Sequence, residues 1–236
     1  MQEIVRRLQN LDTFNHLNER DLKELAYYMK VLHLRNRQIV FNKDEPIKSI
    51  HLVLCGSVKI LEELNGEEVK IFNFLSRGEF LGVAMAGLPQ PKYPTSAQCN
   101  EDCTLLEIPL SLFSQMMIQI PELRKEVNKQ ISQRFLEFQN DICKAHRLVP
   151  FRLANFLLRM LERQGTLSPG RIQIPMTRLD IADRIGAQSE TVIRILSGWT
   201  KRGWLRTEDR HIEVINREAL QEVQFERPHK RLETTA

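Results

Sequence analysis

The stretch GAQSETVIRIL, residues 186–196, places two side chains with distinct hydrogen-bonding chemistry four residues apart. Glu190 and Arg194 lie on the same side of any helix that this stretch forms, because residues four apart are helical neighbours. An arginine can donate two hydrogen bonds to the O6 and N7 acceptors of guanine, and a glutamate can accept one from cytosine N4. The pair therefore predicts base reading in a DNA groove, with a solvated surface ion pair as the alternative.

The residues around this pair fit a helix that lies in such a groove. Four apolar residues have the i, i+3, i+4, i+7 spacing of a buried helical stripe: Val192, Ile195, Leu196 and Trp199. The opposite side carries the residues that we expect to read bases: Ser189, Glu190, Ile193 and Arg194. An exposed Ile193 suits a thymine methyl group, and Glu190 can pair with Arg194 to hold the guanidinium in position.

A short helix and a glycine turn precede this helix. Thr177 and Asp180 have the spacing of a capping box, in which a hydroxyl and an acid three residues later cap a helix start. Four apolar residues predict the buried side of that first helix: Leu179, Ile181, Ala182 and Ile185. Gly186 permits the turn because glycine adopts positive φ without steric cost, and Gln188 or Ser189 can cap the second helix. This arrangement predicts a helix-turn-helix, whose second helix fits the major groove.

Strand patterns flank the two helices. RIQIP, residues 171–175, predicts a strand before them, and RTEDRHIEVIN, residues 206–216, predicts a strand-turn-strand wing after them. Contacts to the DNA backbone position a protein without reading sequence. We expect such contacts from six residues: Thr177, Arg178, Thr191, Ser197, Arg210 and His211.

Charge and composition agree with a protein that binds DNA. The formal net charge is +4, and basic residues outnumber acidic ones between Lys144 and Arg210. No apolar run reaches the roughly 20 residues of a membrane helix, and the N-terminal residues lack the apolar region of a signal peptide. The sequence motifs of common hydrolases, zinc proteases and P-loop enzymes are missing. We therefore expect a cytoplasmic protein that is not an enzyme and has no membrane partner.

The first half of the chain predicts a sensor and a connecting helix. Residues 1–30 have helical spacing; from residue 31 the apolar period changes to two, with glycines at even intervals, which predicts a small roll of short strands. Asn65-Gly66 is a strong hairpin signal within the roll. Pro121 opens a long helix with an apolar seam: Leu123, Val127, Ile131, Phe135, Phe138 and Ile142. We expect the seam to pair with its copy in a homodimer, and packing on its own domain is the alternative.

The order of roll, long helix and winged helix-turn-helix resembles the family of the cyclic-AMP receptor protein and the fumarate-nitrate reduction regulators (CRP/FNR) over nearly the whole chain. The most specific part is MTRLDIADRIGAQSETVIRIL, residues 176–196, with the E-[ST]-[VI]-x-R core at Glu190 to Arg194. The resemblance implies an α+β fold with an N-terminal cyclic-nucleotide-binding-like β-roll, a long dimerisation helix and a C-terminal winged helix-turn-helix. The implied parts are an effector-sensing roll with the N-terminal helices (residues 1–120), the dimerisation helix and hinge (121–149), the DNA-binding domain (150–225) and a flexible tail (226–236).

The resemblance also implies the partners of the chain. These are double-stranded DNA with a palindromic site, a second copy of the chain, RNA polymerase, and a small-molecule effector of unknown identity. Ser189 stands where the cyclic-AMP receptor has arginine, which leaves the outer bases of each half-site open. A signal at the roll would reorient the long helix through the hinge around residues 146–149.

RGEFLG, residues 77–82, resembles the phosphate-binding cassette of cyclic-nucleotide domains. The resemblance assigns Glu79 to a ribose hydroxyl, while Gly78 and Gly82 let backbone amides approach the phosphate. The cassette should close with Arg-Ser/Thr-Ala, but this chain has Thr95 and Ser96 before Ala97. Without the arginine that would neutralise the phosphate, we do not expect control by cAMP of the usual kind. A cyclic-nucleotide-responsive regulator, or a redox, haem or other ligand sensor that uses the roll, is the alternative.

Cysteines and histidines give no support to a resident cofactor. Relatives that sense oxygen hold an iron–sulfur cluster largely with N-terminal cysteines, whereas no cysteine here precedes Cys55. The two thiols of Cys99 and Cys103 make a poor metal site without further ligands, and we expect them to be buried and inert. Haem binding would need an axial histidine or cysteine ligand. It stays open because three histidines are candidates, although no motif supports them: His16, His33 and His51.

Overall fold

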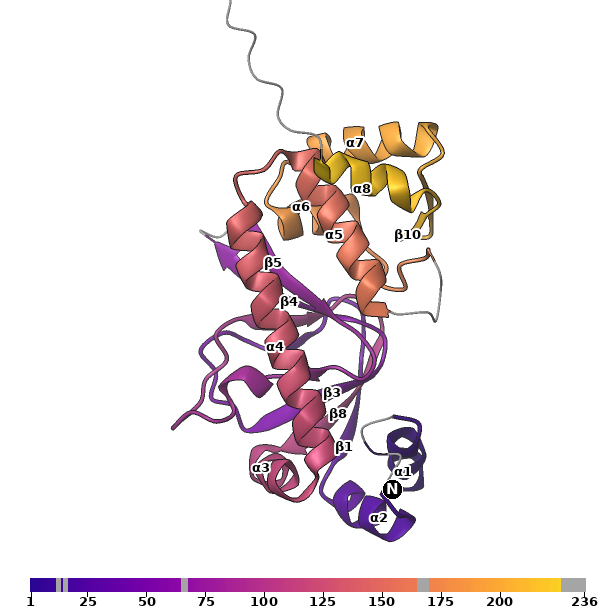
Figure 1. The fold of residues 1–236 in the computed structure, drawn as a ribbon. Helices are drawn as coiled ribbons and strands as arrows, with labels where there is room; N and C mark the ends of the chain where they lie inside the picture. The colour runs from indigo at the N-terminus through magenta and orange to yellow at the C-terminus, as the bar shows by residue number, and fades with distance from the viewer. Residues whose placement is uncertain (12–13, 15–16, 65–67, 165–169, 226–236) are drawn as a thin grey trace, which may run out of the picture. The chain divides into compact units, whose positions relative to one another are not determined.

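The computed structural model describes residues 1–11, 14, 17–64, 68–164 and 170–225. The chain forms two compact units, Met1–Asn140 and Asp141–Ala236 (Figure 1). Three features that the sequence singled out lie outside the described residues: His16, the turn at Asn65-Gly66 and the tail at 226–236.

The first unit contains a roll of two antiparallel four-stranded sheets, as the apolar period of two predicts. One sheet has the strand order β1-β8-β3-β6 and the other β2-β7-β4-β5. The strands are β1 (Lys30–Leu34), β2 (Ile39–Phe41), β3 (Ser49–Cys55), β4 (Val58–Leu64), β5 (Glu68–Leu75), β6 (Phe80–Leu81), β7 (Ser96–Cys99) and β8 (Cys103–Pro109). A 3-10 turn, η1 (Val83–Met85), follows β6. β4 and β5 pair in antiparallel fashion from Val58↔Leu75 to Leu64↔Glu68, so both strands of the predicted hairpin are present.

Four helices pack with the sheets around one apolar core. They are α1 (Gln2–Gln9), α2 (Glu19–Tyr27), α3 (Leu110–Gln119) and α4 (Pro121–Lys144). The core includes Leu22 from the N-terminal helices, Phe80 and Leu106 from the sheet strands, and Phe113 from α3. Each of these side chains is at most 2% exposed, so the predicted helical and strand patterns converge on a single interior.

The two halves of α4 have different surroundings. Leu123 and Val127 are 0% and 1% exposed and belong to the roll core, so their prediction as dimer-seam residues is wrong. Ile131 is partly buried against the same core. The remaining seam residues expose 57%, 52% and 58% of their surfaces: Phe135, Phe138 and Ile142. The reason is geometric, because each step of four residues turns a helix about 40° past a full turn and rotates the apolar stripe from the roll toward solvent.

The second unit contains a helix-turn-helix and a small wing. Its helices are α5 (Val149–Gln164), α6 (Arg178–Ile185), α7 (Ser189–Lys201) and α8 (Arg217–Phe225). Strands β9 (Leu205–Glu208) and β10 (His211–Val214) pair as an antiparallel hairpin, which confirms the predicted wing.

The predicted RIQIP strand is wrong. In this described segment the structure has an isolated bridge between Arg171 and Glu213 in place of a strand. Ile172 and Ile174 are buried in the second unit, and Pro175 lacks the N–H that a longer ladder would need. Across the described part of the chain, no helix is long and apolar enough to cross a membrane.

Candidate functional site

The helix α7 is amphipathic in the way that its spacing predicts. Val192, Leu196 and Trp199 are at most 5% exposed and hold the helix against the second unit. Glu190 and Arg194 are exposed, and Ile193 exposes 46% of its surface beside them. Further along, Ser197 is exposed, whereas Ser189 and Thr191 are half-buried. Gln188 is the N-cap residue, but its side chain makes no capping hydrogen bond.

Glu190 and Arg194 form no ion pair with each other or with any other residue that the structure describes. The predicted intramolecular pair is therefore wrong. Its absence leaves a carboxylate and a guanidinium side by side on an exposed helix face, each with its hydrogen-bonding groups available to a ligand.

The first helix of the motif begins with the predicted capping box. Thr177 Oγ1 accepts a hydrogen bond from Asp180 N at 3.0 Å and donates one to Asp180 Oδ2 at 2.6 Å. Because the Thr177 hydroxyl is committed to this cap, a DNA phosphate near it would have to use the backbone or share the hydroxyl. Leu179 is 58% exposed, so its assignment to the buried side of this helix is wrong.

Arg152 of α5 holds the turn between the two helices. Its Nη1 donates hydrogen bonds to the carbonyl oxygens of Ile185 at 2.5 Å and Gly186 at 3.0 Å. Gly186 has φ 67°, the left-handed conformation that glycine adopts without strain. Burial lowers the pKa of Arg152, but a guanidinium stays charged at neutral pH and satisfies carbonyls that end the helix.

An ionic cluster within the second unit anchors the helix α6. Asp141 Oδ2 lies 2.7 Å from Arg184 Nη2, and its Oδ1 lies 3.1 Å from Arg159 Nη1. The Arg184 side chain is 8% exposed, and its guanidinium also lies 5.6 Å from the ring centroid of Phe156. Sequence reasoning missed Asp141, Arg152 and Arg184 as positioning residues, since their partners are distant in the chain.

The two backbone-contact candidates Arg178 and Arg210 differ in their surroundings. Arg178 is half-buried and donates from Nη2 to Thr207 Oγ1 of β9 at 3.1 Å. Burial lowers its pKa. Arg210 lies exposed at the tip of the wing, where its φ is 64°. Next to it, His211 Nε2 lies 3.1 Å from the carbonyl oxygen of Gln173, so this ring is engaged within the protein.

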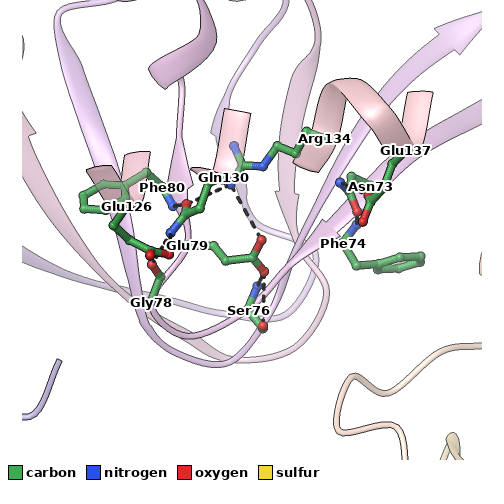
Figure 2. A network of polar contacts seen from close by, with 10 residues as sticks. All are labelled: Asn73, Phe74, Ser76, Gly78, Glu79, Phe80, Glu126, Gln130, Arg134 and Glu137. Carbon is green, nitrogen blue, oxygen red and sulfur yellow. Dashed lines mark hydrogen bonds and ion pairs between the residues drawn. The ribbon is translucent and has the colours of Figure 1, made fainter. Parts of the chain in front are cut away.

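In the first unit, the cassette-like turn before β6 is bound to α4 (Figure 2). Gln130 is 5% exposed; its Oε1 accepts from Phe80 N at 3.0 Å and its Nε2 donates to the Gly78 carbonyl oxygen at 2.9 Å. Glu79 Oε2 accepts from Ser76 N at 2.9 Å. Its Oε1 lies 3.7 Å from Arg134 Nη2.

These contacts engage groups that the resemblance assigns to a ribose or a phosphate. The Glu79 carboxylate is engaged at both oxygens, and the Gly78 and Phe80 backbone groups are paired with Gln130. Gly82 has φ 85°, and a Cβ there would lie 3.0 Å from the Tyr93 ring, so its place beside Tyr93 requires glycine. Sequence reasoning missed Gln130 and Arg134, although their spacing places both polar residues beside the buried face of α4.

The opposite side of the cassette carries no arginine. Thr95 and Ser96 are half-buried, and Ser96 Oγ accepts a hydrogen bond from Lys43 N at 3.0 Å. Ser96 therefore has a local structural contact, while Thr95 supplies no cation for a phosphate. The cation that the structure places nearest to Glu79 is Arg134 of α4, and not a residue at position 95.

The remaining candidates fit structural roles. His51 is 6% exposed, and His33 Nδ1 lies 3.3 Å from Thr104 Oγ1. Cys99 and Cys103 are buried, as predicted, whereas Cys55 and Cys143 are exposed. Among the residues that the structure describes, no group of three or more histidine, cysteine or acidic side chains is arranged to hold a metal ion.

Each of the two units matches a known domain family. A Crp-like helix-turn-helix domain model matches residues 151–223, and a cyclic nucleotide-binding domain model matches residues 31–119. The fumarate and nitrate reduction regulatory protein of Escherichia coli is 26% identical over 208 residues, which are 86% of this chain and 82% of that protein. The transcriptional activator protein FnrA of Stutzerimonas stutzeri is 23% identical over 186 residues, 78% of this chain and 75% of that protein.

A solved structure shares the fold. FixK2 from Bradyrhizobium japonicum superposes with a TM-score of 0.71 at 23% identity, covering 83% of this chain and 96% of that one.

Proposed function

Because this chain belongs to the CRP/FNR family of transcriptional regulators, we propose that it binds an inverted repeat in double-stranded DNA as a homodimer, with α7 in the major groove. The family consists of transcription factors, so the chain is a DNA-binding regulator and not an enzyme. The observation that carries the finer proposal is the exposed pair Glu190 and Arg194, whose side chains form no hydrogen bond or ion pair with other described residues.

Base reading is assigned to four residues of α7. Arg194 donates to guanine O6 and N7, and Glu190 accepts from cytosine N4. Ile193 contacts a thymine methyl group, which would cover an apolar surface that is 46% exposed in the free protein. Ser189 is short and half-buried, so its contact would come from the hydroxyl near the start of the helix.

Backbone contacts surround this face. We assign them to Arg178, Thr191, Ser197 and Arg210, with Thr177 acting mainly through the capping box that places Arg178. His211 supports the wing through its contact with the Gln173 carbonyl. Contacts of this kind fix the register of the protein and contribute equally on all sequences.

The homodimer is assigned to the exposed half of α4. Phe135, Phe138 and Ile142 recur at three- and four-residue spacing, and each exposes more than half of its surface. A two-fold symmetric pairing of this helix would present two copies of α7 to successive major grooves, about 34 Å apart.

We further propose that cAMP does not control this regulator. The cassette lacks its arginine, and Glu79 is already bound by Ser76 and Arg134. We also propose that a different small-molecule effector acts at the roll. We propose RNA polymerase as a further partner of the DNA-bound protein.

Selection from random duplex DNA tests the proposal. The full-length protein is incubated with the library at one fixed salt concentration, with and without cAMP, since phosphate contacts make affinity salt-dependent. We expect an inverted repeat to be enriched equally in both arms. No enrichment in either arm would overturn DNA reading, whereas enrichment only with cAMP would overturn nucleotide independence and leave DNA reading intact.

A further inference from the structure

The C-terminal end of α7 carries an arginine outside the set of DNA contacts proposed above. Arg202 is the C-cap residue of the helix and is exposed. Its guanidinium carbon lies 5.2 Å from the centroid of the Trp204 ring, and its side chain forms no hydrogen bond or ion pair with another described residue. An aromatic ring therefore places this charge, and no described carboxylate neutralises it.

Trp204 is itself held in place by the second unit. Its backbone N donates to the Trp199 carbonyl oxygen at 2.9 Å, and its carbonyl oxygen accepts from Ile215 N at 2.9 Å and from Asn216 N at 3.2 Å. The Trp199 ring, which is 5% exposed, has its centroid 6.1 Å from that of Trp204. A planar guanidinium that stacks on such a ring keeps the N–H groups at its edge available to an acceptor. The position of Arg202 is thus restricted before any ligand binds.

Arg202 lies on the same flank of α7 as Thr191, which we assign to the DNA backbone. At about 100° per residue, Thr191, Gly198 and Arg202 lie within about 40° of one another around the helix axis. The same rotation places Arg202 about 80° from Arg194. The flank therefore borders the face of α7 that we assign to base reading.

Gly198 leaves this flank open between Thr191 and Arg202. A Cβ at position 198 would meet no described atom within 4 Å outside its own stretch of helix, so packing does not require glycine there. Its φ is not in the left-handed region either. Glycine inside a helix is unfavourable compared with alanine. The absence of a side chain instead suits the close approach of a partner to the helix.

We propose that Arg202 binds a phosphate of the DNA strand that passes along this flank, and that Gly198 admits the strand close to α7. This inference rests on the proposed placement of α7 in the major groove. A guanidinium donates two parallel hydrogen bonds to phosphate oxygens, and each phosphate that a cation neutralises releases counterions. The contact carries no sequence information, so it acts on any duplex.

Salt titration of DNA binding tests the contact. The full-length parent, Arg202→Ala and Arg20→Ala are titrated at several salt concentrations with the duplex selected from the library and with a random duplex. Arg20 is the matched control, because it is exposed in α2 and its loss changes the net charge equally. We expect Arg202→Ala to weaken binding to both duplexes by the same factor. We also expect it to reduce the slope of log K against log salt by about 0.9 for each half-site, while Arg20→Ala matches the parent.

An unchanged slope in Arg202→Ala, or a loss of affinity confined to the selected duplex, overturns the phosphate contact. An equal effect of Arg20→Ala overturns it too, because the effect would then come from net charge. A parent that binds neither duplex overturns the proposed function and this contact together, so the two failures can be told apart.

Two further variants separate the contact from folding. Arg202→Lys keeps the charge and should restore the salt slope, but it should bind more weakly than the parent because an ammonium group lacks the stacked, forked geometry. Gly198→Gln should keep the thermal midpoint of the parent, since glutamine favours a helix, and should weaken binding to both duplexes by obstructing the strand. A slope for Arg202→Lys equal to that of Arg202→Ala, or parental affinity in Gly198→Gln, contradicts the proposal.

Discussion

Two arginines of the helix-turn-helix show how the surroundings of one residue set its role. Arg178 is half-buried and bound to Thr207. Arg194 is exposed on α7, and its side chain forms no hydrogen bond or ion pair with another described residue. We therefore propose the first guanidinium, which the protein already holds in place, for a phosphate, and the second, which is exposed, for a base edge.

We expect Arg194→Ala to cost about 1–3 kcal/mol on cognate DNA and to flatten the preference at one base pair of each half-site. Fluorescence anisotropy on the cognate duplex and on single-base-pair variants measures both effects. Arg178→Ala is the matched control, and it should weaken cognate and random DNA equally. If Arg194→Ala did the same, its role would be electrostatic and not base reading.

His51 is a buried imidazole in the roll. Burial lowers its pKa, and the nearby Glu107 opposes that shift in part. Its Nδ1 has no hydrogen-bond partner among the described residues, and its ring lies 6.0 Å from that of Phe41. The folded protein therefore holds this histidine neutral.

Stability should accordingly fall at acid pH. The unfolded chain takes up a proton on His51 below about pH 6.5, while the folded chain resists it. The contribution of the neutral His51 to the free energy of unfolding is complete above that pH. It is lost as pH falls toward the lowered pKa of His51 in the folded protein. Thermal unfolding midpoints between about pH 5 and pH 8 should decline less steeply for His51→Leu than for the parent. Parallel curves for the two proteins would show that another group carries the dependence.

At the scale of the element, the short helix α6 depends on contacts from distant residues. Its capping box could be recognised in the sequence, because Thr177 and Asp180 are three residues apart. Its anchoring by Asp141 and Arg152 could not, because pairs separated by more than 30 residues along the chain have no local spacing rule. Propensity and capping predict that such a helix exists, and packing decides where it lies.

We expect Asp141→Asn to destabilise the second unit by about 1–2 kcal/mol. Loss of the carboxylate charge leaves the buried Arg184 guanidinium poorly compensated, and the figure is reduced because Asp141 is 35% exposed. Denaturant unfolding measures the change.

Glu162→Gln is the matched control for this ion pair. It breaks the exposed pair of Glu162 with Arg217, which are 59% and 52% exposed, and should cost about 0.5 kcal/mol or less. Equal effects of Asp141→Asn and Glu162→Gln would show that the Asp141 cluster does not anchor α6.

At the scale of the whole molecule, the two halves of α4 have different surroundings. Leu123, Val127 and Gln130 bind it to the roll, and Phe135, Phe138 and Ile142 leave an apolar stripe exposed. Monomers rarely expose apolar side chains in a continuous stripe without a partner. A second copy of the same stripe is the partner that we propose.

We expect Phe135→Ser combined with Phe138→Ser to shift the protein from dimer to monomer in sedimentation equilibrium, because both changes remove apolar surface from the stripe. Leu136→Ser is the control: Leu136 is 57% exposed, as Phe135 is, but as the next residue it lies about 100° further around the helix and off the stripe. A dimer that persists in the double variant, or is lost with Leu136→Ser, would place the interface elsewhere.

Local chemistry in the sequence was enough to predict the helix-turn-helix, the wing, the roll and the missing cassette arginine. Caps, turns and apolar periodicity act over a few residues, so they can be recognised without knowing the fold. Tertiary structure alone decided three matters: Leu123 and Val127 face the roll, Glu190 and Arg194 form no ion pair within the described part of the chain, and Gln130 binds the cassette-like turn. These depend on the rotation of a helix against its neighbours and on contacts between distant residues, which a linear pattern does not contain.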